Sequence, residues 1–432
     1  MKLIEDYLSV EQKYIDKYGK DIFLLFQVGS FFELYCLESD MSRIKKYASI
    51  CDLKVTTKNE TYNNSKVWLC GFNIIQVDDY IKKTHQYGHI CVVYIQDEST
   101  KTKKEYVPRK LFQVFTPATT FIDESPRLSN NMSCIWIQKT RDLAMQQTYV
   151  FGLSNIDIYT GKTDICEYQE TYYHNPTTYD NIEKFLSVYN PIELIIIHNV
   201  DNEIIDSIIQ YLSVNSKTVH KINVNDETND LSCQATRCQN QVYQNEIIEK
   251  FYPDIKNKES FKYTLFEKII SFQSFCFLLN FVEQHNPSFV KRLKEPIIEN
   301  QNTTLLCANH SLKQLNIIDN SESFGDFSSV LKFLNKCHTT MGQRYMKDLL
   351  LNPICNIKEL TKSYDTIEHF NNKKYNFSDH LNNIKDIEKI LTKVKMSKAN
   401  PYDYYCLHSS ILQIEKIIKI TKNDKKLYDL LD

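Results

Sequence analysis

The spacing of apolar residues changes along this chain of 432 residues, and the change limits the folds open to it. Up to about residue 250, apolar residues come in short runs such as Ile22–Val28 and Ile90–Gln96, which indicate β-strands. From about Phe261 they recur every three or four residues, as on a helix with one buried face. The sequence therefore predicts a multidomain protein, mixed α/β first and all-α afterwards.

The first 120 or so residues are predicted to form a mixed α/β domain. Strands are expected at Ile22–Val28, 31–35, 66–72 and Ile90–Gln96, and a helix from Val77 to about Gln86 that ends near Gly88. Gly29 and Ser30 separate the first two strands, so the second enters in a different direction. The polar, basic segment 99–110 is expected to be a loop, and Phe121–Asn131 a linker.

The middle of the chain is predicted to hold a second α/β domain. Strands are expected at 134–138, 149–161 and 163–168, with turns at Ser154-Asn155 and Thr160-Gly161, followed by a helix near Tyr179–Tyr189 and a strand at 193–199. Strands followed by a helix and a strand fit an RNase H-like fold. The polar stretch Asn223–Asn245 is expected to be a second loose connection.

Three apolar stripes at helical spacing predict that the last third is all-α with long helices. The stripes are Phe261, Leu265, Ile269, Phe272, Cys276 and Leu279, expected on one helix; Ile384, Ile387, Leu391 and Val394; and Leu407, Ile411, Ile414 and Ile418. The chain ends at Asp432 soon after the last stripe, with no Gly or Pro to signal a stop, so we expect it to be cut short.

The composition excludes nucleotide binding through a glycine-rich phosphate loop, and it bears on nucleic-acid binding and on the redox compartment. The chain has only 8 glycines, and no two are five apart, so neither a G-x-x-x-x-G-K-[ST] phosphate loop nor a G-x-G-x-x-G fingerprint can form. A net charge of −2 provides no global attraction to nucleic acid and leaves a local binding face open. The 13 cysteines lack metal-ligand spacing, which favours buried reduced thiols in a reducing compartment.

The chain is expected to be soluble and intracellular. Its N-terminus, MKLIEDYLSVEQK, is an acidic amphipathic start rather than a secretory signal. No run of about 18 apolar residues exists, so no membrane span is expected. The abundance of Asn, Ile, Lys and Tyr indicates an AT-rich genome, which is compatible with a large DNA virus as the host.

Several blocks of sequence, in order over nearly the whole chain, resemble the MutS family of DNA mismatch-recognition proteins. They are FLLFQVGSFFELY with Gly29, Phe31 and Glu33; GFNIIQVDDYIKKTHQYGHICVVYIQD; RKLFQVFTPAT; GLSNIDIYTGK; SSVLKFLNKCHTTMGQRYMKDLLLNP; and IKDIEKILTKVKMSKANPYD. Phe32, Asn73 and Ala118 depart from the family pattern, which usually has tyrosine, proline and glycine there. The larger departure is the absence of the C-terminal ATPase with its phosphate loop and dimerising helix-turn-helix.

The resemblance implies three parts: a mismatch-recognition α/β domain at 1–122, a non-catalytic RNase H-like connector at 123–250, and an incomplete core and lever region at 251–432. It also implies that double-stranded DNA with mismatches or small loops is the ligand. Dimerisation would use the missing C-terminal region, and downstream repair proteins would bind the connector. No cofactor is expected in this chain, and ATP and Mg²⁺ are expected only if a C-terminal ATPase exists elsewhere; the chain itself is not expected to be an enzyme.

Phe31 and Glu33 are the candidate mismatch-reading pair, next to Gly29. Residues two apart in a strand point to the same side, so Phe31 and Glu33 point together and Phe32 points into the core. An aromatic ring on a strand can unstack a flexible base step and kink the duplex. The family resemblance implies that Glu33 shares a hydrogen bond with a displaced base. The alternative interpretation is that Phe31 is an ordinary aromatic residue of the core and Glu33 an ordinary solvated residue of the strand.

Candidate phosphate contacts lie in the densest basic cluster of the first domain. The cluster comprises Lys101, Lys103, Lys104, Arg109 and Lys110. Basic side chains near the reading pair would contact the DNA backbone. A solvated loop is the alternative for the same five residues.

Two other functions remain open from sequence alone. An RNase H-like fold can carry metal-binding carboxylates, and Asp157 and Asp164 would face each other if Thr160-Gly161 were a two-residue turn. No further carboxylates at suitable strand ends can be found, so neither a catalytic residue nor a metal ligand is assigned. The second alternative is a non-catalytic scaffold that binds branched DNA or proteins; the Phe-x-Glu pair favours mismatch reading over it.

Overall fold

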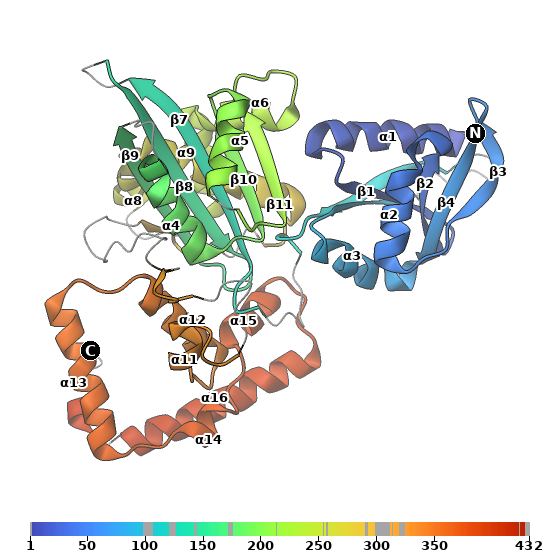
Figure 1. The fold of residues 1–432 in the computed structure, drawn as a ribbon. Coiled ribbons are helices and arrows are strands. Elements are labelled where there is room, and N and C mark those ends of the chain that lie inside the picture. Colours follow the sequence, from blue (N-terminus) through green and yellow to red (C-terminus); the bar gives the residue numbers. More distant parts are fainter. Residues whose placement is uncertain are drawn as a thin grey trace.

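The computed structural model is mixed α/β in its N-terminal half and helical in its C-terminal half (Figure 1). It describes residues 2–97, 107–120, 127–141, 145–171, 176–212, 214–253, 255, 258–289, 293–298, 312, 314–318, 325–422 and 424–427. Two six-stranded sheets lie side by side, the first at the blue end of the chain and the second in green, and the orange and red helices follow them.

The first sheet has the strand order β3-β4-β2-β1-β5-β6. Its elements are α1 (Lys2–Tyr18), β1 (Ile22–Val28), β2 (Phe31–Leu37), α2 (Met41–Cys51), β3 (Thr56–Tyr62), β4 (Ser65–Asn73), α3 (Val77–Gln86), β5 (Ile90–Gln96) and β6 (Arg109–Phe115). The predicted strands and the predicted helix of this part are confirmed, including the left-handed backbone at Gly88 after α3. Residues 98–106, on which most of the predicted loop falls, lie outside the described part; Arg109 and Lys110, predicted as its last residues, instead begin β6.

Alternation of apolar residues gives the first sheet two buried faces, each covered by helices. Tyr7 of α1 packs on one face with Phe26 and Tyr35 at ring-centre distances of 5.1 and 5.2 Å. On the other face Tyr47 of α2 packs on Phe23 at 4.7 Å. Because both faces are buried, β1 has apolar residues at every position from Ile22 to Phe26.

The second sheet has the strand order β11-β10-β7-β8-β9-β12. Its strands are β7 (Asn131–Arg141), β8 (Gln147–Asp157), β9 (Thr163–Thr171), β10 (Glu193–His198), β11 (Thr218–Asn223) and β12 (Ile297–Ile298). β7, β8 and β9 form an antiparallel meander, and β10 and β11 add in parallel beside β7. The turn predicted at Ser154-Asn155 is wrong: both residues lie within β8, where their side chains form buried hydrogen bonds with Ser274 and Ser133.

Helices cover both faces of the second sheet. They are α4 (Asp180–Tyr189) and α5 (Asn202–Tyr211) on one face, and α6 (Asp230–Cys238), α7 (Gln241–Phe251), α8 (Lys258–Phe266) and α9 (Ile269–His285) on the other. The loose connection predicted at Asn223–Asn245 is wrong, because Asn229 and Asn240 each cap a helix there. Leu231, Ala235 and Cys238 supply the apolar face that buries α6 against the rest of the core.

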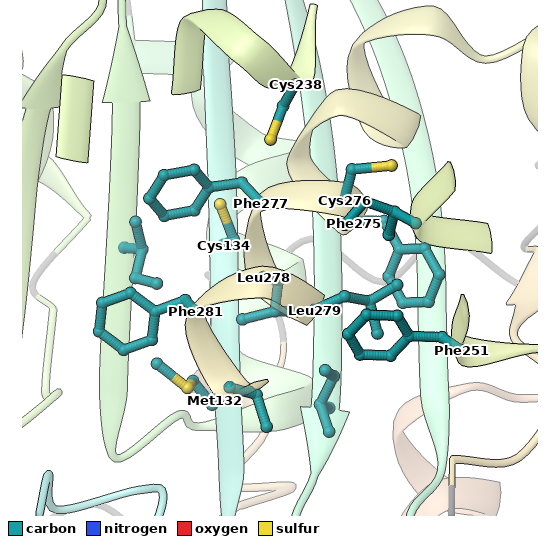
Figure 2. Close-up of a cluster of buried hydrophobic side chains, with 14 of the residues drawn as sticks. Met132, Cys134, Cys238, Phe251, Phe275, Cys276, Phe277, Leu278, Leu279 and Phe281 are labelled. Atoms are coloured by element: carbon teal, nitrogen blue, oxygen red, sulfur yellow. The ribbon is translucent and has the colours of Figure 1, made fainter. Parts of the chain in front are cut away.

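The central helix of this core is α9, whose residues from Ser271 to Leu279 are all buried (Figure 2). In Figure 2 its phenylalanine and leucine side chains lie among Met132 and Cys134 of the sheet and Phe251 of α7. The single helix predicted from Phe261 to Leu279 is wrong: the chain bends by 113° between α8 and α9. The Glu167 carboxylate accepts hydrogen bonds of 2.8 Å from both Ile270 N and Ser271 N, so it caps a new helix start.

The last described elements are all helical, as predicted. They are α11 (Val330–Leu334), α12 (Thr340–Leu351), α13 (Ile357–Lys373), α14 (Ser378–Leu381), α15 (Ile387–Lys395) and α16 (Pro401–Thr421). Ile384 of the second predicted stripe lies just before α15, and the third stripe lies within α16. Asn400 and Asp403 form a capping box at the start of α16, with Pro401 in its first turn.

Two expectations from the sequence concern the cysteine thiols and membrane-spanning helices. Of the twelve cysteines in the described residues, nine are buried, and all twelve are free thiols. In the described part of the chain no single helix is long and apolar enough to cross a membrane. The bent pair α8–α9 passes by length and composition alone, and α9 lies in the core.

Candidate nucleic-acid interface

A two-residue hairpin turn places Phe31 at the start of β2, one of the central strands of the first sheet. Val28 pairs with Phe31, and only Gly29 and Ser30 lie between them. Gly29 has a φ of +60° whereas Ser30 does not have a positive φ, the pattern of a type II′ turn. Glycine at the first turn position allows this tight turn. Phe31 is therefore held at the end of a strand that is paired from its first residue.

Alternation along β2 separates an exposed ring from a buried one. Phe31 is 48% exposed, whereas Phe32 is 4% exposed and packs 6.1 Å from the ring of Phe72. The prediction that Phe32 belongs to the core is confirmed. The neighbouring Glu33 is half-buried and lies on the same face of the strand as Phe31.

The Glu33 side chain is surrounded on three sides. Its residue pairs with Phe26 of β1 on one side and with Gly71 of β4 on the other. Along the strand, the Tyr35 hydroxyl donates a hydrogen bond to Glu33 Oε2. A Cβ atom at position 71 would lie 3.1 Å from Glu33 Cγ and 2.8 Å from the Phe32 carbonyl oxygen, so glycine there leaves room for the carboxylate. Alternation could have indicated Tyr35 from sequence, whereas Gly71 required the strand register.

A second short turn lies beside the hairpin. The Ile74–Gln76 turn follows β4, and Ile74 N donates to the Ser30 carbonyl oxygen at 3.0 Å. Asn73 caps this turn by accepting from Ile75 N at 3.1 Å, and its φ of −67° is also the value that a proline ring imposes. The side chain of Ile75 is 89% exposed next to the hairpin, a feature that sequence reasoning missed.

The predicted basic cluster is described only in part. Lys101, Lys103 and Lys104 lie outside the described residues. Arg109 begins β6 at the same end of the sheet as the hairpin, and its guanidinium donates to the carbonyl oxygens of Gln27 and Val107 at 3.2 and 2.7 Å. Lys110 pairs with Asp97 at 3.3 Å. A role for these residues in phosphate binding stays a prediction.

A buried carboxylate joins the first sheet to the second. Glu193, at the start of β10, is fully buried and accepts from Thr116 Oγ1 at 2.6 Å, Ala118 N at 3.1 Å and His220 Nε2 at 2.7 Å. Thr116 and Ala118 directly follow β6. Although burial favours the neutral acid, the hydrogen bonds from His220 and Thr116 hold the pKa of Glu193 below its ordinary value.

A second buried contact joins α1 to α9. Because His285 Nδ1 lies 2.6 Å from the Phe281 carbonyl oxygen, Nδ1 carries the proton, and Nε2 accepts from the Tyr18 hydroxyl at 2.9 Å. Gln113 of β6 donates to the His285 carbonyl oxygen at 2.7 Å. The domain with the hairpin is therefore fixed to the second sheet through both ends of its chain.

The two aspartates considered for a nuclease do not face each other. Asp164 pairs with Asn155, because the chain from Ile158 to Lys162 forms a longer turn than two residues. The Asp157 carboxylate accepts from Asn130 N, Tyr159 N and Thr160 Oγ1, so it organises this turn. The described residues contain no group of three or more His, Cys, Asp or Glu side chains able to hold a metal ion.

Arg344 joins the second sheet to the helical part. Its guanidinium binds both Asp386 oxygens at 2.6 and 2.8 Å, Glu388 at 2.8 Å, and the Leu128 carbonyl oxygen at 3.2 Å. Although burial favours the neutral acid, Arg344 holds the pKa of Asp386 below its ordinary value. A cavity of about 400 Å³ lies beside Arg344, between the β8–β9 turn and α12.

Comparisons with known proteins agree with an α/β part at the start of the chain and a helical part at its end. Residues 3–124 match the family model of MutS domain I, and residues 310–431 match that of MutS domain III. The mutS homolog L359 of Acanthamoeba polyphaga mimivirus is 24% identical over 98% of this chain and 40% of its own length. The DNA mismatch repair protein MutS of Caldanaerobacter subterraneus is 23% identical over 100% of this chain and 46% of its own. The chain thus spans less than half the length of these relatives.

Proposed function

The chain belongs to the MutS family, and from this premise we propose that it recognises mismatched DNA by inserting the Phe31 ring into a deformable base step. The observation that carries the proposal is the exposure of Phe31, 48%, at a strand end whose next residue is anchored in the core. Exposed aromatic rings on rigid elements are suited to wedging between bases.

The physical basis of discrimination would be the deformability of the duplex. Unstacking one base step costs about a few kcal/mol. Stacking of a base on the Phe31 ring returns roughly 1–3 kcal/mol. A well-paired step resists the exchange and a mispaired step permits it, so the choice depends on shape and flexibility rather than on base sequence. Glu33, on the same face as Phe31, would accept a hydrogen bond from the displaced base.

The remaining parts would support this reading domain. We propose that residues 123–250 form an RNase H-like connector; an antiparallel meander with two parallel strands added beside its first strand supports this. ATP hydrolysis would need a C-terminal ATPase outside this chain, because the eight glycines cannot form a phosphate loop. Dimerisation through such a region, and contact of repair proteins with the connector, are proposals of the same kind.

Binding of the full chain to a duplex with one G·T mispair and to its perfectly paired counterpart tests the function. Both titrations are run at the same fixed salt concentration, since phosphate contacts make affinity strongly salt-dependent. We expect tighter binding to the mispaired duplex, and loss of that preference in Phe31→Ala. Phe112→Ala, at a similarly exposed ring of β6, is the control and should keep the preference. An unchanged ratio in Phe31→Ala would show that the ring does not read mismatches.

The same titrations address the scaffold alternative. A chain that binds branched DNA or proteins without reading mismatches would bind both duplexes equally, whichever residue stands at position 31. The nuclease alternative has lost support, because the Asp157 carboxylate is engaged by three hydrogen-bond donors, two from its own turn and one from the backbone of Asn130.

A further inference from the structure

A fully buried tyrosine lies directly behind the proposed reading pair. Tyr35 follows Glu33 by two residues on β2, so both side chains point to the face covered by α1. The Tyr35 ring is 0% exposed and packs edge-on against Tyr7 at 5.2 Å. Its hydroxyl donates to Glu33 Oε2. A core residue therefore holds a side chain that reaches the surface.

The Tyr35 ring is fixed from more than one side. The Lys58 ammonium group, on β3 two strands away in the sheet, lies 5.1 Å from the ring centre, within the range of a cation–π contact. With Tyr7 packed against it as well, the ring has little freedom to rotate away. The hydroxyl position, and with it one oxygen of Glu33, is set by the core of the domain.

A free glutamate has several rotamers, and most would point its carboxylate away from a displaced base. Fixing these rotamers before binding reduces the entropy lost when the complex forms. Gly71 leaves the space that the fixed side chain occupies, since any Cβ there would lie 3.1 Å from Glu33 Cγ. With Oε2 engaged by Tyr35, Oε1 is the oxygen available to accept a hydrogen bond from a base.

We propose that Tyr35 is a positioning residue for mismatch reading: its hydroxyl holds Glu33 so that the second carboxylate oxygen meets the displaced base. The inference rests on the proposed function and adds a residue to its site. Tyr35 does not touch DNA, because it is completely buried. Its contribution passes through Glu33 alone.

The test is a double-mutant cycle on the mismatch preference, the ratio of the full chain's affinities for the G·T duplex and the perfect duplex. Tyr35→Phe removes only the hydroxyl and keeps the packed ring. We expect the preference to fall by about three- to tenfold, the size of effect expected for the loss of one hydrogen bond of ordinary net strength, with the affinity for the perfect duplex unchanged. In the Glu33→Ala background the same substitution should leave the ratio unchanged.

Tyr7→Phe is the matched control. Tyr7 is equally buried on the same face, and its hydroxyl donates to the Leu24 carbonyl oxygen at 2.9 Å rather than to Glu33. Its loss should lower the melting temperature and keep the preference, which separates positioning from general stability. A preference that Tyr35→Phe leaves intact, or reduces equally with and without Glu33, overturns the positioning role.

The Phe31→Ala variant distinguishes the two proposals. If the wild-type chain prefers the mispaired duplex, Phe31→Ala abolishes the preference and Tyr35→Phe retains it, the positioning role alone fails. If the wild-type chain shows no preference, the proposed function fails and the positioning role fails with it.

Discussion

The Glu193 carboxylate accepts a hydrogen bond of 2.6 Å from the Thr116 hydroxyl, and this contact joins the two sheets of the protein. Thr116 directly follows the last strand of the first sheet, and Glu193 begins a strand of the second. The same carboxylate also binds Ala118 N and His220. The buried Glu193 carboxylate therefore helps to fix the point at which the domain that carries Phe31 is attached to the second sheet.

Replacement of Glu193 should strongly destabilise the protein. Glu193→Ala leaves three buried donors without their acceptor, which we expect to lower the free energy of unfolding by about 2–4 kcal/mol. Urea denaturation followed by circular dichroism measures the change. Glu246→Ala, at an exposed position of α7, is the control and should stay within about 0.5 kcal/mol of the wild type. An equally small effect of Glu193→Ala would contradict the role of this carboxylate in joining the two sheets.

The contact between Tyr18 of α1 and His285 of α9 predicts that the protein loses stability in mild acid. Burial lowers the pKa of His285 to about 4, below the value of about 6.5 for an unfolded histidine. Between these pH values the unfolded chain binds the proton and the folded chain does not, so stability falls as pH decreases from about 6.5 to about 4. One such proton contributes a slope of up to about 1.4 kcal/mol per pH unit.

Denaturation midpoints across this pH range test the prediction. His285→Gln should be less stable at neutral pH and should show a shallower fall, because the buried imidazole is gone. His408→Gln, at an exposed position of α16, is the control and should keep the wild-type slope. A His285→Gln slope equal to that of the wild type would mean that other groups account for the acid sensitivity.

Arg344 should not tolerate replacement by lysine. An ammonium group cannot bind both oxygens of Asp386 and reach Glu388 and Leu128 as the guanidinium does. Arg344→Lys should therefore lower the free energy of unfolding by about 1–3 kcal/mol. Arg141→Lys, at the exposed end of β7, should have little effect in the same urea titration. Equal effects of the two substitutions would show that Arg344 contributes as an ordinary surface charge.

Local patterns were enough to predict most strands and the opposite directions of the Phe31 and Phe32 side chains. Alternation placed Phe31 and Phe32 on opposite sides of β2, because side-chain direction in a strand depends only on position along it. Apolar runs bounded by turn residues likewise gave β1 and β5 with their observed ends. Such features depend on neighbours in the sequence, so a single sequence contains them.

Features that depend on distant partners could not be predicted. α6 lies in a polar stretch, and its few apolar residues became informative only with α9 to pack against. The break between α8 and α9 depends on Glu167, about a hundred residues earlier in the chain, which caps the second helix. The register that places Asp164 opposite Asn155 depends on the length of the turn. The contacts of Glu193 likewise combine residues from two strands, β10 and β11, with the loop that follows β6.

The glycine opposite Glu33 gives a last prediction, which concerns stability and the proposed function together. Gly71→Ala places a methyl group 2.8 Å from the Phe32 carbonyl oxygen and 3.1 Å from Glu33 Cγ, so the strand or the carboxylate has to move. We expect unfolding to become easier by about 1–3 kcal/mol and the mismatch preference to fall, because Glu33 is displaced. Thr57→Ala, at an exposed position of β3, is the control for both measurements. A Gly71→Ala protein with lower stability and full preference would show that the carboxylate adapts, and that its exact position does not matter for reading.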